Sequence, residues 1–254
     1  FSQPIVKGQA VINKGRAFKQ NFDQTNFKFS FANQQFNFDR LEIKYGSSKA
    51  IASGSLKNKE LNLDISSSDL ALDDIDPLAK FAQIKGQAQV TGRVYGPLSN
   101  LKAAGKVDSQ NIKVNQYQLG EGSARIRYNQ SKLYLTKGQL TSNSNQGDFR
   151  GSIDLSNRQF NDLEIDISQV DLDYLEQFFK IELPQNYPLQ GRVEISGSLL
   201  KPKLALDLVI ADLDQEGSLT VKGNYWLKQG MDLSLVGRKI NLVYLNSLDL
   251  IPHR

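Results

Sequence analysis

The chain has 254 residues, of which 39% are hydrophobic and 23% charged, a balance typical of an ordered protein that excludes a disordered one. It contains no cysteine, which excludes disulfides, thiolate metal sites and cysteine nucleophiles. The net charge is only +4 and basic residues are interspersed with acidic ones, so the chain lacks the basic block of a nucleic-acid-binding protein and we expect no nucleic-acid partner.

The single histidine, His253, lies beside the C-terminus. Most acid–base and metal chemistry near neutral pH uses histidine, so we expect neither an enzyme nor a cofactor. The chain begins at Phe1 without a signal-peptide pattern, which predicts a piece of a longer protein or a mature form. It has no apolar run of roughly 18 residues or more, so we expect no membrane-spanning helix.

Apolar and polar residues alternate along most of the chain, from the three phenylalanines of 27–31 onward. Such alternation predicts strands with one dry and one wet face, as in antiparallel sheets. The clearest of these strands are 27–31, 87–95, 123–128, 147–155, 204–210, 218–226 and 231–235.

Short polar turns separate the strands, and the order predicts a meander of hairpins. The expected turns are at 58–59, 100, 129–131, 156–157 and 228–230. Two segments, 73–84 and 171–184, instead have apolar residues at helical spacing, and we expect one or two short helices there.

The pattern repeats along the chain, which favours an array built from similar units. An offset of 105 residues (191 − 86) relates Gly86, Gly92 and Pro97 to Gly191, Gly197 and Pro202. The segment Asp64-Ile65-Ser66 returns as Asp166-Ile167-Ser168. We expect one elongated body with approximate repeat units 1–53, 54–150 and 151–254.

Two groups of carboxylates are candidates for calcium binding, but neither has the glycine and spacing of a calcium loop. They are Asp73, Asp74 and Asp76, and Asp212, Asp214 and Glu216. We interpret both as solvated turn residues and expect no metal site. Glycoside hydrolysis needs two carboxylates across a cleft, and aspartates on wet strand faces do not predict that.

The apolar rows have two interpretations, a sealed core or the wall of an open groove, and periodicity alone does not decide between them. If they form a groove, its lining residues are expected to be the apolar members of the strands. These candidates are Val90, Val94, Ile126, Leu133, Leu135, Phe149, Ile153, Ile165, Ile167, Val193, Ile195, Leu204, Leu206, Leu208, Leu219, Val221, Leu233 and Leu235.

Two stretches, GQAQVTGRVYGPLSNLKAAGKV from Gly86 and GRVEISGSLLKPKLALDLVIADL from Gly191, resemble the TamB family of bacterial envelope proteins, within the wider AsmA-like and bridge-like lipid-transfer group. This resemblance implies an all-β fold, an elongated antiparallel sheet curled into a U-shaped trough (a β-taco) with an apolar inner face. It also implies transport of phospholipid, bound by its acyl chains, between membranes, linked to outer-membrane biogenesis.

The resemblance further implies a location in the periplasm or the plastid envelope intermembrane space. Contacts with the inner and outer membranes, and with a BamA-type outer-membrane barrel, would come from parts of the protein outside this chain. Two alternatives stay open. One is a scaffold or chaperone that assists outer-membrane protein assembly or translocation by strand pairing, and the other is a carbohydrate-handling β-helix.

Overall fold

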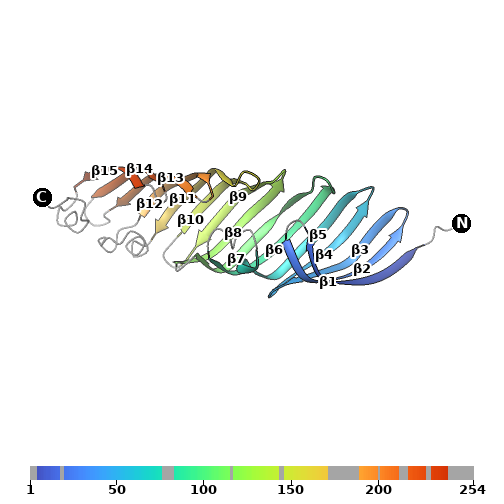
Figure 1. The fold of residues 1–254 in the computed structure, drawn as a ribbon. Helices are drawn as coiled ribbons and strands as arrows, with labels where there is room; N and C mark the ends of the chain where they lie inside the picture. Colours follow the sequence, from blue (N-terminus) through green and yellow to red (C-terminus); the bar gives the residue numbers. More distant parts are fainter. Residues whose placement is uncertain are drawn as a thin grey trace. The chain divides into compact units, whose positions relative to one another are not determined.

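The computed structural model describes residues 5–17, 20–75, 83–114, 117–142, 146–170, 189–199, 201–211, 217–226 and 230–239. The chain forms two compact units, Phe1–Thr136 (unit 1) and Lys137–Arg254 (unit 2). The fold is all-β, and the strands are hydrogen-bonded in chain order from β1 to β15, so the two end strands are not paired with each other (Figure 1). The predicted fold class, an open antiparallel sheet built from hairpins, is confirmed.

Unit 1 contains eight complete strands, each of which pairs antiparallel with the next. They are β1 (Val6–Ala17), β2 (Gln20–Ala32), β3 (Gln35–Tyr45), β4 (Ser48–Lys57), β5 (Glu60–Ala71), β6 (Ile84–Pro97), β7 (Lys102–Val114) and β8 (Tyr117–Asn129).

The strand β9 (Lys132–Thr141) begins in unit 1 and ends in unit 2. The remaining strands belong to unit 2 and also pair antiparallel in chain order. They are β10 (Gln146–Asp154), β11 (Gln159–Val170), β12 (Leu189–Ser198), β13 (Lys201–Ala211), β14 (Ser218–Trp226) and β15 (Gly230–Arg238).

Several hairpins turn through two residues that both have a positive φ, as in a type I′ turn. Asn58 and Lys59 join β4 to β5 with φ of 49° and 65°, and Gln130 and Ser131 join β8 to β9 with 48° and 62°. This turn matches the right-handed twist of the flanking strands. The turns predicted at 58–59, 100, 129–131 and 156–157 are confirmed. Of the turn predicted at 228–230, residues 228 and 229 lie outside the described residues.

Helix is confined to one 3₁₀ turn, Leu72–Asp74, among the described residues. Asp74 accepts hydrogen bonds from the amides and hydroxyls of Ser47 and Ser48, which ties this turn to the β3–β4 hairpin. Of the helix predicted over 73–84, residues 76–82 lie outside the described part, and Ile84 already belongs to β6. The helix predicted over 171–184 lies wholly outside it. The described residues form no helix of the length and apolarity needed to span a membrane.

Alternation gives the sheet an apolar face and a polar face. In β5, Leu61, Leu63 and Ile65 are half-buried, while Asn62 and Asp64 between them are exposed. Register shifts interrupt the pairing at Ser67/Leu70 in unit 1 and at Ile167/Val170 in unit 2. Such bulges bend a strand and increase its twist, and the sheet of each unit is curled (Figure 1).

The register gives the internal repeat a physical basis. Asp64 and Arg93 are cross-strand partners and form an ion pair at 2.9 Å, and Asp166 and Arg192 do the same at 2.7 Å. The register therefore matches Gly92-Arg93-Val94 with Gly191-Arg192-Val193, an offset of 99 residues (191 − 92). The offset of 105 expected from glycine spacing is not the one that the strand pairing follows, because pairing depends on the preceding strand and not on glycine spacing alone.

A serine makes the same kind of bond in both units, one residue farther from the ion-paired aspartate in unit 1 than in unit 2. Ser67 donates from Oγ to the Lys49 carbonyl oxygen at 2.6 Å, and Ser168 donates to the Gln146 carbonyl oxygen at 3.0 Å. Each bond joins the end of one strand to the start of the strand before it, beside the bulge. The boundaries 53/54 and 150/151 of the expected repeat units stay predictions.

Candidate functional site

The apolar face of unit 2 brings the predicted groove residues into cross-strand rows. Ile165, Val193 and Leu206 lie opposite one another on β11, β12 and β13. A second row holds Ile167, Leu208, Val221 and Leu235, and a third pairs Ile195 with Leu204. Phe149 lies opposite Ile165, and Ile153 lies opposite Phe160; Leu219 lies opposite Ile210, and Leu233 opposite Gly223. The predicted alternation therefore places these residues on one face.

In unit 1 the predicted residues share the apolar face with smaller side chains. Val94 lies between Leu63 and Ala103, and Val90 lies between Ser67 and Val107. Ile126 lies opposite Gly105, while Leu133 and Leu135 are half-buried positions of β9.

An aromatic cluster on β2 and β3 also belongs to this face, and the candidate list missed it. Phe31 and Phe36 lie with ring centroids 4.6 Å apart, and Phe27, Phe29 and Phe38 continue the cluster at 5.9 to 6.3 Å. The alternation of residues 27–31 predicts the part of the cluster on β2. On β3 only two phenylalanines, Phe36 and Phe38, follow the alternation.

Most side chains of the apolar face are half-buried and not sealed. All the predicted groove residues are half-buried except Leu233 and Leu235, which are exposed on the end strand β15. Fully buried hydrophobic residues among the described ones are Ala52, Leu72, Ala88, Ala124 and Leu189. A packed second layer would bury large side chains along whole strands, and in the described part of the chain no second layer covers this face.

The neighbouring strands β6 and β7 come close on the apolar side of unit 1 where two glycines pair. A methyl group on Gly92 would lie 2.5 Å from the Ala104 carbonyl oxygen and 3.0 Å from Cα of its partner Gly105. The buried residues Ala52, Ala88 and Ala124 belong to the same face. Small residues therefore occupy positions of this face where a neighbouring backbone comes close.

Phenylalanine rings cover glycines of the neighbouring strand at three places. A methyl group on Gly138 would lie 2.3 Å from a ring carbon of Phe149, and Gly8 and Gly15 meet the rings of Phe29 and Phe22 in the same way. The predicted groove residue Phe149 therefore also packs over β9.

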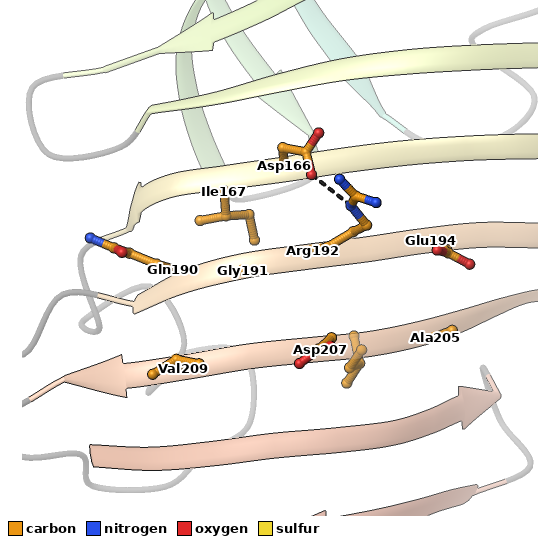
Figure 2. A pocket seen from close by; sticks show the side chains of 10 residues that line it. Asp166, Ile167, Gln190, Gly191, Arg192, Glu194, Ala205, Asp207 and Val209 are labelled. Atoms are coloured by element: carbon orange, nitrogen blue, oxygen red, sulfur yellow. Dashed lines mark hydrogen bonds and ion pairs between the residues drawn. The ribbon is translucent and has the colours of Figure 1, made fainter. Parts of the chain in front are cut away.

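The polar face is different in character. A shallow depression of about 810 Å³ lies on β11–β13 among Asp166, Gln190, Arg192, Glu194 and Asp207 (Figure 2). Arg192 donates from Nε to Asp166 Oδ1 at 2.7 Å, which raises the pKa of the guanidinium.

Lys222 continues this row and pairs with Asp207 at 3.0 Å. The paired side chains keep 41% or more of their surface exposed, so water screens them. We interpret the depression as a solvated row of ion pairs, and the candidate site is the opposite, apolar face.

Among the described residues no cluster of three potential metal ligands occurs. Asp74 is bound to Ser47 and Ser48, and Asp76 lies outside the described part, as do Asp212, Asp214 and Glu216. The structure therefore assigns Asp74, of the first carboxylate group, a role in holding a hairpin.

Comparison with known proteins found no matching family model, no matching curated protein and no matching solved structure.

Proposed function

We propose that this chain is a stretch of a TamB-like envelope protein whose apolar face carries the acyl chains of phospholipids between membranes. The setting we propose is the periplasm or the plastid envelope intermembrane space, and the process is linked to outer-membrane biogenesis. Contacts with the two membranes and with a BamA-type barrel belong to parts of such a protein outside this chain.

The observation that carries the proposal is a continuous apolar face without a covering layer in the described part of the chain. The rows Ile165–Val193–Leu206 and Ile167–Leu208–Val221 run across successive strands with half-buried side chains. A contiguous apolar surface that no second layer covers is typical of a binding surface.

The energetics suit transport better than tight storage. Each methylene that leaves water for an apolar surface is stabilised by about 0.8 kcal/mol, so a whole acyl chain is held strongly. Successive rows offer similar aliphatic side chains, so a chain can shift from one row to the next with little change in free energy. The proposal requires neither a catalytic residue nor a cofactor.

Native mass spectrometry of the chain, with analysis of its organic extract, tests the proposal. We expect phospholipid to copurify, and a diazirine on the acyl chain to crosslink to residues such as Val193 and Leu206. Absence of lipid together with crosslinks confined to the polar face would contradict it.

Strand pairing with client proteins is the second candidate function, and the end strands favour it. Val6, Val11 and Ile12 on β1 are 56%, 59% and 46% exposed, and Val236 on β15 is 54% exposed. Unpaired strand edges bind extended peptides through main-chain hydrogen bonds. Binding of a strand peptide that is lost on backbone N-methylation would support this function, and unchanged binding after methylation would contradict it.

A further inference from the structure

The turns after β4, β6, β8, β10 and β12 form one edge of the sheet, because consecutive strands are antiparallel. Residues 57–60, 97–102 and 129–132 form this edge in unit 1, and residues 154–159 together with 198–199 and 201–203 form it in unit 2. We name this edge the hairpin rim.

Cations gather on the hairpin rim. The described ones are Lys57, Lys59, Lys102, Lys132, Arg158, Lys201 and Lys203. Lys203 lies 5.6 Å from the ring centre of Trp226, whereas the other six make no ion pair with any described residue. The carboxylates of the rim are Glu60 and Asp154, and Asp154 is occupied by hydrogen bonds from Ser156 and Asn157. The rim thus carries an excess of unpaired positive charge.

The same contact links neighbouring turns of the rim in both units. The Leu98 amide donates to the Lys59 carbonyl oxygen at 2.9 Å, and the Leu199 amide donates to the Arg158 carbonyl oxygen at 2.9 Å. Each contact places a leucine beside a turn that carries a cation. Leu98 is 48% exposed, so this apolar group faces solvent at the rim.

The apolar face begins next to the rim. Leu56 and Leu61 are cross-strand partners one step inside the Lys57–Glu60 turn, and Ile153 and Phe160 take the same place in unit 2. A molecule with an acyl chain on these residues would have its polar head at the cations.

We infer that the hairpin rim binds the phosphate of the lipid headgroup while the acyl chains lie on the apolar face. This inference rests on the proposed function and adds the headgroup class, an anionic phosphodiester, and the edge along which it travels. Exposed lysine and arginine attract anionic lipid without fixing it, because each contact is weak and screened by salt. A series of such cations lets a headgroup move from turn to turn together with its chains.

The test compares two triple variants of the full chain with equal charge change. The rim variant is Lys57→Gln, Lys59→Gln and Lys102→Gln, and the control replaces Lys28, Lys113 and Arg125, exposed cations within strands, by Gln. Binding of phosphatidylglycerol and of diacylglycerol with identical chains is measured by native mass spectrometry at low salt. Inorganic phosphate is titrated as the probe without chains.

We expect phosphatidylglycerol affinity to fall at least about tenfold in the rim variant and to change little in the control, with diacylglycerol binding equal in all three proteins. Equal loss in both variants, or no loss in the rim variant, would overturn the inference. Displacement of phosphatidylglycerol by millimolar inorganic phosphate would also overturn it, since the rim would then be a free-phosphate site. If none of the three proteins bound diacylglycerol, this result would instead contradict the proposed function.

Discussion

The two units share their internal geometry and differ in charge. Residues 1–136 contain 19 basic and 11 acidic residues, a net +8, whereas residues 137–254 contain 12 and 16, a net −4. Cross-strand partners of like charge follow the same division. They are basic in unit 1, at Lys28/Arg40, Lys44/Lys49, Lys85/Lys113 and Lys106/Arg125, and acidic in unit 2, at Asp148/Asp166 and Glu164/Glu194.

What repeats is the set of residues that shape the sheet. Asp64–Arg93 and Asp166–Arg192 pair alike, Ser67 and Ser168 bond alike, and Gly54 and Gly151 have φ of 147° and 151°. The wet face is free to vary because exposed charges add little to stability. The comparison teaches that backbone-shaping positions define the unit, while surface charge is set separately in each copy.

The largest effect is expected at the buried position that both units share. Ala88 lies opposite Leu70, and Leu189 lies opposite Val170, and both are almost fully buried. A glutamate in either place would leave a carboxylate without water or partner, so Ala88→Glu and Leu189→Glu should each cost several kcal/mol, about 3 or more. Hydrogen exchange should show loss of protection in unit 1 for the first variant and in unit 2 for the second.

The double variant Val193→Glu and Leu208→Glu is the matched control on the half-buried part of the same face. Its carboxylates can reach water, so the chain should keep a β-type circular dichroism spectrum with a modestly lower melting temperature. Complete unfolding of this control would show that the face is a sealed core. An unchanged melting temperature of Leu189→Glu would show that burial of Leu189 does not stabilise the fold.

A smaller effect, of equal size in both units, is expected at the repeated glycines. A methyl group on Gly54 would lie 2.0 Å from the Asn62 carbonyl oxygen, and one on Gly151 would lie 2.5 Å from that of Asp162. Alanine at either position adds backbone strain to this clash, and we expect each to lower the free energy of unfolding by about 2–4 kcal/mol.

Gly230→Ala separates the two causes, because Gly230 has φ 122° but no atom within 4 Å of the added methyl group. In a denaturant titration, Gly230→Ala should lower the free energy of unfolding by about 1–2 kcal/mol, the effect of backbone strain alone. If alanine at Gly54 or Gly151 lowered the free energy of unfolding no more than Gly230→Ala does, steric crowding would not explain the effect.

The sequence predicts strands, turns and the apolar face well, because alternation and turn residues are local signals. It does not predict the register: the glycine spacing of Gly86 and Gly191 suggests one offset, and the pairing of Ile65 with Gly92 and of Ile167 with Gly191 follows another. The aromatic cluster is visible in Phe27–Phe31, but its contact with Phe36 depends on the register that the turn at Asn33 and Gln34 sets for the β2–β3 pairing. The cationic rim depends on which turns share an edge, which only the topology supplies.

An acid-sensitive turn is expected in unit 2, between β10 and β11. Hydrogen bonds from the Ser156 hydroxyl and the Asn157 amide lower the pKa of Asp154 from 3.8 to about 2. The folded pKa is below the unfolded one, so the stabilisation is complete above pH 3.8 and is lost as the pH falls toward about 2.

Over that range the amides of Ser156 and Asn157 should exchange faster, while the Asn58–Lys59 turn of unit 1, which no described carboxylate caps, should not change. Asp154→Asn should remove the pH dependence at the β10–β11 turn. Equal acceleration at both turns would instead indicate general acid unfolding.

The smallest effect concerns the like-charged partners that distinguish the units. Arg125→Glu places a carboxylate opposite Lys106, and Glu194→Lys places a cation opposite Glu164, so each converts a repulsive pair into an attractive one. We expect each to raise the free energy of unfolding by roughly 0.2–1 kcal/mol, and the gain to shrink in 1 M salt, where the Debye length is about 3 Å.

The reversed charges also move the two units toward neutrality, so the variants test whether the charge difference between the units is tolerated or required. If both gain stability and phospholipid binding is unchanged, the charge difference is only a tolerated variation of the wet face. If the gain in stability comes with loss of binding in the Arg125 variant alone, the basic charge of unit 1 serves an anionic partner despite its cost to the fold.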